Sequence, residues 1–448
     1  MQKIKTRIGI KAQHTEMLYS MLLIIALCLF GSENKLVVAI ILLAFVPLIF
    51  KPEYLIGPIL FSNAWGSWFL ISEGQTFTRY LTLLFLLGVF LVVINRKEKI
   101  KVDFWFISIM TSLILGLALS MFGSHGYTSI PTSFILAMLL LLAMLYCPVK
   151  SKEGLIKQIW WFTIIGIAFA FFLILRNGLD VFEAGRFGVE TEESIGSNAV
   201  GKSICTLALV VFAHFLVGNF KGKILHISMI LLSLFLIFLT GSRNALLAFI
   251  IASVICLLYW LKLNSRRLLP SMLLIAVMLV ASYYIYNGLV DAFPDLMERF
   301  TLDNVMDDGG TGRIDIWKAY FGALFQDYWL FGLGFDPNNL YHAVQDVNGI
   351  GHGAHNHIVD ILASTGIVGF VLFMWMHVRT YKISLNTIRR DVTALIPFAM
   401  LTATLLLGIG ENVLRGRPLW FSTALVIVFY RLNKKEDEGV SSLTEGIK

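Results

Sequence analysis

Charged residues are scarce in this chain of 448 residues. Asp, Glu, Lys and Arg together make up 15% of it, whereas a soluble protein would carry about 25%. Hydrophobic residues reach 57%, and the mean hydropathy is +0.77. A globular core cannot absorb this much apolar sequence, but a lipid bilayer can. The composition therefore excludes a soluble protein and predicts an all-α, polytopic membrane helix bundle.

Cysteine is scarce too. Its four copies, Cys28, Cys147, Cys205 and Cys256, all lie in apolar stretches and show neither disulfide nor metal-ligand spacing. No small-residue cleavage site follows the basic N-terminal segment, which is therefore expected to stay attached as a cytoplasmic tail. Soluble domains, internal repeats and low-complexity tracts are also lacking. Residues 1–448 are thus expected to form a single integral membrane domain.

Apolar runs long enough to span a bilayer, or nearly so, recur fourteen times. The first two are short, and one re-entrant hairpin in their place would leave twelve spans. The runs are 17–31, 36–50, 54–72, 78–95, 103–122, 129–148, 155–176, 199–218, 223–241, 244–262, 268–287, 355–377, 392–410 and 416–432.

The basic residues predict the orientation of these runs. If the N-terminus is cytoplasmic and the runs alternate, 25 of the 36 Lys and Arg residues fall on the inside, as the positive-inside rule requires. The net charge of +7 then reflects cytoplasmic loops and not a nucleic-acid partner. Both termini are predicted to be cytoplasmic, and the tail at 433–448 is expected to be disordered.

Two of the predicted outer segments are long, 177–198 and 288–354. Within the second, RIDIWKAYFGALF is typical of an amphipathic helix capped by Thr311 or Gly312. Its expected apolar side comprises Ile314, Trp317, Tyr320 and Phe321. The later stretch FGLGFDPNN is expected to be a turn.

Five outer arginines need an explanation, because the positive-inside rule disfavours them. They are Arg186, Arg243, Arg313, Arg415 and Arg417. Each one alone is equally well explained by contacts with lipid phosphates or nearby carboxylates. As a group around one outer cavity, their planar guanidinium forks favour a phosphate or pyrophosphate ligand.

The stretch GHGAHNHIVDILASTGIVGF, at 351–370, is the densest cluster of groups that accept a proton near neutral pH. It joins a polar loop with three histidines, His352, His355 and His357, to an apolar helix. Gly366 and Gly369 lie on roughly one face of that helix, where small residues let a neighbouring helix pack closely. This packing would place His355 at the mouth of the bundle.

Three roles are open to His355. It caps a helix or makes interfacial hydrogen bonds; it binds zinc together with His352, His357 and Asp360, although the spacing is unlike a tetrahedral site; or it is a general base. The last is favoured, because an imidazole beside phosphate-binding arginines would deprotonate a sugar hydroxyl. The arginines would meanwhile stabilise the charge of a departing diphosphate. Neither a metal ion nor a cofactor is then required.

The pattern His355-Asn356, nine residues, Gly366, two residues, Gly369 resembles the signature of the O-antigen ligase and O-antigen polymerase superfamily. Its context is similar as well, and the resemblance covers roughly residues 180–432. The matching motifs are GSRN at Arg243, TGRIDIW at Arg313 and, less sharply, GRFG and SN at Arg186 and Asn198.

The resemblance implies a metal-independent membrane glycosyltransferase with a GT-C-like fold in the bacterial inner membrane. Its site, facing the periplasm, would transfer a glycan with inversion from undecaprenyl pyrophosphate to an acceptor hydroxyl. His355 would be the base, and Arg243, Arg313 and Arg186 would bind the donor pyrophosphate. Supporting candidates are Asn356, Asn198, Arg417 and His352, with loop and acceptor-side roles for His352 and His357.

The superfamily motif does not separate a polymerase, which extends a lipid-linked repeat unit, from a ligase, which transfers the glycan to lipid A-core. Fourteen spans favour a polymerase, because ligases more often show twelve. A chain-length regulator is a candidate further partner. A flippase for the same lipid-linked sugars is the alternative from another class, but two related halves with broken helices are lacking.

Overall fold

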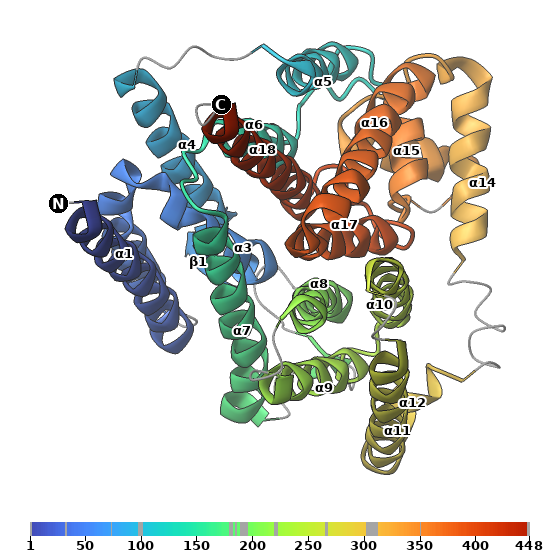
Figure 1. Cartoon of the computed structure of the whole chain (residues 1–448). Helices are drawn as coiled ribbons and strands as arrows, with labels where there is room; N and C mark the ends of the chain where they lie inside the picture. The colour runs from blue at the N-terminus through green and yellow to red at the C-terminus, as the bar shows by residue number, and fades with distance from the viewer. Residues whose placement is uncertain are drawn as a thin grey trace.

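The computed structural model describes residues 2–31, 34–72, 74–96, 102–178, 182–183, 186–188, 196–218, 223–264, 268–301, 312–349 and 351–445. This described part contains 17 α-helices and two short hairpins (Figure 1). The helices are α1 (Gln2–Phe30), α2 (Lys35–Ala44), α3 (Ile56–Trp65), α4 (Phe77–Asn95), α5 (Phe104–Ser120), α6 (Thr132–Tyr146), α7 (Lys152–Asn177), α8 (Ser197–Val217), α9 (Lys223–Leu239), α10 (Arg243–Leu263), α11 (Leu268–Ala292), α12 (Pro294–Glu298), α14 (Arg313–Ala323), α15 (Pro337–Asn348), α16 (His357–Arg390), α17 (Leu395–Leu407) and α18 (Arg417–Glu445).

Shorter elements connect several of these helices. The hairpins pair β1 (Leu70–Ser72) with β2 (Gln75–Thr76) and β3 (Phe182–Glu183) with β4 (Arg186–Phe187), both antiparallel. The 3-10 turns are Val46–Phe50, Pro52–Leu55, Gly66–Trp68 and Val392–Ala394, and a π-helical turn covers Leu324–Tyr328.

Each of the fourteen predicted apolar runs contains a helix, so the all-α membrane class is confirmed. Among the described residues, five helices, α4, α7, α8, α10 and α16, are long and apolar enough to cross a membrane. By contrast, α2 and α3 have 10 residues each. Such helices are about 15 Å long, half of a bilayer core of roughly 30 Å. The total of fourteen spans therefore stays a prediction.

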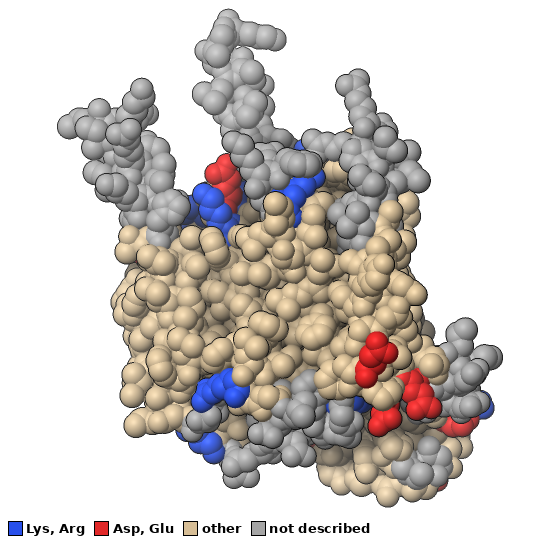
Figure 2. Space-filling model, turned by 90° about the horizontal axis from the view of Figure 1, so that it is seen from below, with Lys and Arg blue, Asp and Glu red and all other residues tan. Residues whose placement is uncertain are grey.

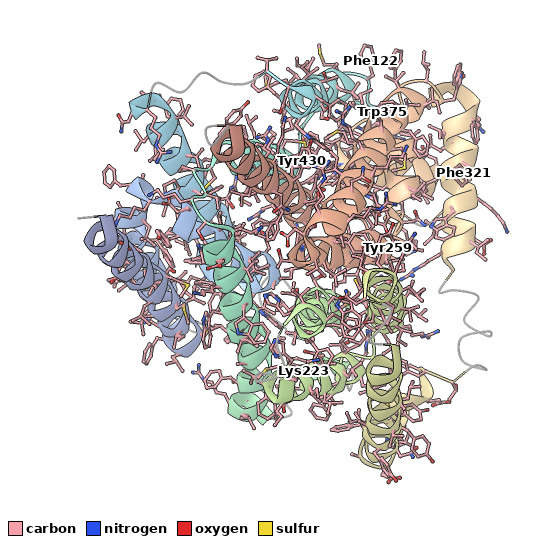
Figure 3. The ribbon with its side chains drawn as sticks, in the orientation of Figure 1. Phe122, Lys223, Tyr259, Phe321, Trp375 and Tyr430 are labelled. Atoms are coloured by element: carbon pink, nitrogen blue, oxygen red, sulfur yellow. The ribbon has the colours of Figure 1, made fainter. Side chains whose placement is uncertain are left out.

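The bundle is organised around α8, which stands among α7, α9, α10 and α17 (Figure 1). Most α8 side chains are buried. Tyr259 of α10 packs on Phe398 of α17, with ring centroids 5.7 Å apart (Figure 3). On the other side of α10, apolar side chains are exposed at helical spacing: Leu247, Ile250, Ile251, Val254 and Leu258. This stripe is suited to contact with lipid chains.

On the face seen in Figure 2, the charged side chains lie towards two ends of the bundle. Figure 2 shows a broad band without Lys, Arg, Asp or Glu on one face, between two charged edges. The ion pairs follow the predicted sides. Predicted inner segments pair with one another in Lys152–Asp391, Lys150–Glu53 and Arg431–Asp103. Predicted outer segments do the same in Lys202–Glu411, Arg415–Asp360 and His125–Asp346.

Two expectations about local structure are wrong. The tail after Arg431 does not leave the helix, because α18 continues to Glu445; extending a formed helix needs no new nucleus. The amphipathic helix at RIDIWKAYFGALF is present as α14 and begins after Gly312. Its buried side, however, comprises Ile316, Ala319, Tyr320 and Ala323, whereas Ile314 is exposed.

Candidate functional site

The turn between α17 and α18, residues 408–416, joins the elements that carry the predicted site residues. We call it the hub turn. The Gly408 carbonyl accepts a hydrogen bond from the backbone N–H of His357, at 2.6 Å. Asn412 Oδ1 accepts one from the backbone N–H of Asn356, at 3.2 Å. Just before the turn, the Leu407 carbonyl accepts one from Asn244 Nδ2 of α10, at 2.9 Å. We call residues 351–357, which carry the three histidines, the histidine loop. This loop and the N-terminus of α10 therefore meet at one end of the bundle.

His355 lies in this loop with a strained backbone. Its φ is 44°, and no other described residue except glycine has a positive φ. This left-handed conformation costs roughly 1–2 kcal/mol in an L-residue. Neighbouring contacts hold it, because Trp317 Nε1 donates to the Ala354 carbonyl at 2.9 Å. The imidazole is 47% exposed, so a ligand can reach it. Strain of this kind is found at functional sites.

Glu411 of the hub turn faces the His355 imidazole, with Oε2 3.9 Å from Nδ1. The same oxygen lies 3.3 Å from Nζ of Lys202 on α8. Burial raises the pKa of Glu411, but His355 and Lys202 outweigh it, so its pKa is lower than usual. The carboxylate therefore stays ionised, and it lies on the Nδ1 side of the imidazole. The role of Lys202 was missed, although a lysine at the outer end of an apolar run is a signal for function.

Arg186 and Arg243 lie at the same short turn, between α9 and α10. Arg243 is the first residue of α10. Arg186 Nε donates to the Thr240 carbonyl at 2.9 Å, and its Nη2 donates to Asn198 Oδ1 at 3.0 Å. Arg186 therefore lies beside the turn that leads into Arg243, and Asn198 holds its guanidinium in place.

Arg299 joins this group and was not predicted. A Cβ at Gly241 would lie 3.1 Å from Arg186 Nε and 3.5 Å from Arg299 Cδ. The Nε of Arg299 is buried without a hydrogen-bond partner. The argument that singled out the other outer arginines applies equally to Arg299, because it lies in the predicted outer segment.

Arg313 is the first residue of α14 and approaches the histidine loop along one helix face. Residues four and seven positions later, Trp317 and Tyr320, share its face. Both contact the loop: Trp317 through the Ala354 carbonyl, and Tyr320 through its hydroxyl, which donates to the His352 carbonyl at 2.6 Å. Arg313 therefore lies on the side of α14 that faces the loop.

The other candidates have structural contacts. Asn356 caps α16, where Oδ1 accepts from the backbone N–H groups of Ile358 and Val359, and its Nδ2 donates to the Ile409 carbonyl at 3.2 Å. Asp360 is fully buried and accepts from Arg415 Nη1 at 2.9 and 3.0 Å. This pair ties α16 to the hub turn and accounts for Arg415 without a ligand.

The acceptor-side role of His357 is wrong. His357 is buried at the start of α16, and its Nε2 lies 2.9 Å from Nε2 of His377. His352 is exposed and meets α14 through its carbonyl. Among the described residues, no group of three His, Cys, Asp or Glu side chains could hold a metal ion. The four residues of the alternative zinc site thus face different partners.

The first signature glycine, Gly366, receives a loop and not a neighbouring helix. Gly366 breaks α16, with φ 61° and ψ −166°. The segment after the π-helical turn fills the break: the backbone N–H groups of Ile367 and Leu333 donate to the carbonyls of Trp329 and Ala363, at 3.0 and 2.7 Å. A Cβ on Gly369 would meet Thr365 at 2.2 Å. The expected helix packing is wrong, because the free backbone groups at Gly366 pair with a loop.

Arg417 has no hydrogen bond, ion pair or electrostatic contact with Arg186, Arg243 or Arg313 among the described residues. It starts α18, and the charge of Arg79 on α4 repels it. None of its hydrogen bonds or ion pairs within the described residues reaches the histidine loop. Its assignment as a supporting residue beside His355 therefore lacks a contact.

Together these features define a multi-helix membrane protein with a strained histidine at one end of the bundle, beside clustered arginines. The family model described as O-antigen ligase matches residues 228–374. This match supports membership of the O-antigen ligase and polymerase superfamily and confirms the resemblance inferred from the sequence. No curated protein matches the chain. The matched segment includes Arg243, Arg313, His355 and Gly366, and the family suggests activity of the glycosyltransferase kind.

Proposed function

We propose that the chain is a surface-polysaccharide polymerase of the bacterial inner membrane. It transfers a glycan from undecaprenyl pyrophosphate to a sugar hydroxyl of a lipid-linked repeat unit. The site faces the periplasm, and both termini are cytoplasmic. The observation that carries this proposal is His355, which is held in a strained, accessible position beside Glu411.

The chemistry follows from the groups around His355. Its Nε2 takes the proton of the acceptor hydroxyl, whose oxygen forms a bond to the anomeric carbon of the donor. The bond from that carbon to the phosphate oxygen breaks, and its electron pair leaves with the diphosphate. Attack opposite the departing group inverts the anomeric centre. The guanidinium groups of Arg243, Arg186 and Arg313 stabilise the departing diphosphate, and Arg299 adds a fourth cation.

A single reconstitution separates the candidate activities. Purified protein in lipid receives undecaprenyl-pyrophosphate oligosaccharide without a nucleotide sugar. A ladder of longer products supports the polymerase. Product that forms only after lipid A-core is added indicates a ligase, the activity that the family description names. No product under either condition, together with movement of the lipid-linked sugar across vesicles, would indicate a flippase and refute the proposal.

A pair of variants tests the base. His355→Ala is expected to lower the transfer rate by about 100-fold or more, the usual contribution of a general base. His342→Ala is the matched control, because His342 lies on α15 in the same outer segment and contacts Tyr127 and Gln345. Equal activity of the two variants would remove His355 from the mechanism.

A further inference from the structure

A further pair of arginines, Arg79 and Arg417, lies at the predicted outer ends of two apolar runs, at the same end of the bundle. Arg79 is in the first turn of α4, and Arg417 begins α18. Their charges are close enough to repel each other. No carboxylate of the described residues forms an ion pair with either of them. Two neighbouring cations without a counter-ion favour an anionic ligand.

The free donors of this pair support the same conclusion. Arg417 Nη1 is buried and has no hydrogen-bond partner. Arg79 Nη1 donates to the neutral Gln75 Oε1 at 3.2 Å, which leaves its other N–H groups for a ligand. Both arginines lie in the first turn of a helix. At the start of α4, the side chain of the N-cap residue Thr76 makes no capping hydrogen bond to the first backbone N–H groups. The positive ends of two helices therefore add to the charge of the guanidinium groups.

A cavity of about 210 Å³ begins next to Arg417, because Gly416 and Pro418 both line it. Most of its wall is apolar and comes from α3, α8, α17 and the start of α18. Asn63 also lines it, and both polar atoms of the Asn63 side chain are buried without a hydrogen-bond partner. An unpaired amide in such a wall calls for a ligand with hydroxyl groups.

One part of the cavity wall adjoins the histidine loop. Lys202 and Asn412 line this wall. Lys202 contacts Glu411, which faces His355, and Asn412 accepts from the backbone N–H of Asn356. The cavity therefore lies between the Arg79–Arg417 pair and the residues that hold His355.

We propose that the Arg79–Arg417 pair and this cavity form a second substrate site, which binds the acceptor lipid. The arginines bind its phosphate, the cavity holds the adjoining sugar, and an acceptor hydroxyl lies at the Lys202 end, towards His355. This inference rests on the proposed function and names where its second substrate binds. The acceptors of a polymerase and of a ligase share the required chemistry, a phosphorylated lipid that carries a glycan. The acceptor phosphate remains intact during transfer.

The test counts bound lipid by native mass spectrometry, with undecaprenyl diphosphate as the probe. The wild-type chain is expected to bind two molecules. The double variant Arg79→Gln, Arg417→Gln is expected to bind one molecule. Each of the two substitutions should raise the dissociation constant of the second lipid molecule roughly tenfold. A matched donor-site variant, Arg186→Gln with Arg243→Gln, should lose the other molecule. Lys382→Gln, which removes an exposed charge from the opposite end, should bind two.

The outcomes separate this inference from the proposed function. If the wild type binds one molecule, and only the donor-site variant loses it, the second site is refuted and the proposed function stands. If the wild type binds none, the proposed donor site fails. Displacement of the second molecule by phosphatidylglycerol at equal concentration would also refute an acceptor site. Displacement by lipid A-core alone would identify a ligase acceptor, and resistance to it a polymerase acceptor.

Two further measurements guard against misfolding. The single variant Arg79→Gln changes a half-buried side chain with one neutral hydrogen bond, so it is expected to keep the wild-type melting temperature. It should raise the acceptor KM about tenfold while the donor KM and kcat stay within about twofold. Equal changes in both KM values, or a change in kcat alone, would refute an acceptor-binding role.

Discussion

Replacing Gly366 by alanine tests the break in α16. If the helix were continuous, the substitution would stabilise the protein by up to about 1 kcal/mol. In the structure, Gly366 has φ 61° and ψ −166°, a region open almost only to glycine, where another residue costs about 1–3 kcal/mol. The new Cβ would also lie 2.3 Å from the Leu330 carbonyl oxygen and 2.6 Å from the Gly332 nitrogen. Overpacking of this kind adds about 1–3 kcal/mol.

The expected destabilisation is thus roughly 2–6 kcal/mol, a large part of the stability of a typical domain. Thermal unfolding of the purified protein in detergent measures it. Gly322→Ala in α14 is the matched control, because its Cβ meets nothing within 4 Å and the change should raise the melting temperature. If Gly366→Ala also raised it, the break and the docking of 329–333 against it would be refuted.

Three other substitutions test the contacts around the histidine loop. Arg415→Met should lower the free energy of unfolding by about 3–5 kcal/mol, because it leaves Asp360 charged and buried, and Asp360→Leu in the same chain should restore most of it in denaturant titrations. Glu411→Gln should lower the melting temperature at neutral pH. The pKa of Glu411 is below its ordinary value of 4.5. The ionised carboxylate therefore stabilises the fold above that pH, and this stabilisation disappears as the pH falls through the folded-state pKa. A constant difference between wild type and Glu411→Gln across this range would contradict the contact with His355. Arg243→Lys should reduce kcat/KM at least about tenfold despite the retained charge, because the fork geometry is lost; wild-type kinetics would show that charge alone is sufficient.

The local patterns of the sequence predict the helices well. A run of about 20 apolar residues has few alternatives to a helix in lipid, since its backbone groups must pair within the segment. The alternation of basic loops also groups the correct segments at each end, as the separate ion pairs Lys152–Asp391 and Lys202–Glu411 illustrate. The break at Gly366 was not predicted, because local patterns do not show which element packs against a residue. A glycine inside an apolar run has the same local sequence whether its partner is a loop or a helix.

The site was only partly predictable, because its contacts join residues far apart in the sequence. The outer arginines and His355 stand out one by one, since each breaks a compositional rule. Their partners do not. Asp360 and Arg415 are 55 positions apart, and the approach of Arg79 to Arg417 depends on how α3, α4 and α18 pack. For His357, proximity to His355 in the sequence suggested a shared role, but the first turn of α16 directs its side chain into the bundle, towards His377.

The strained backbone of His355 and the broken helix at Gly366 belong to one arrangement. The break shortens the first part of α16 to residues 357–365, and this short helix is held on several sides. Leu333 pairs with its Ala363 carbonyl, Arg415 holds its Asp360, and Asn356 caps its first turn. A short helix fixed in this way cannot rotate to relieve φ at the residue before its cap. The left-handed conformation of His355 is therefore imposed by contacts on both sides of the loop, and loosening the break at Gly366 is expected to release the imidazole from Glu411 as well as to lower the stability of the bundle.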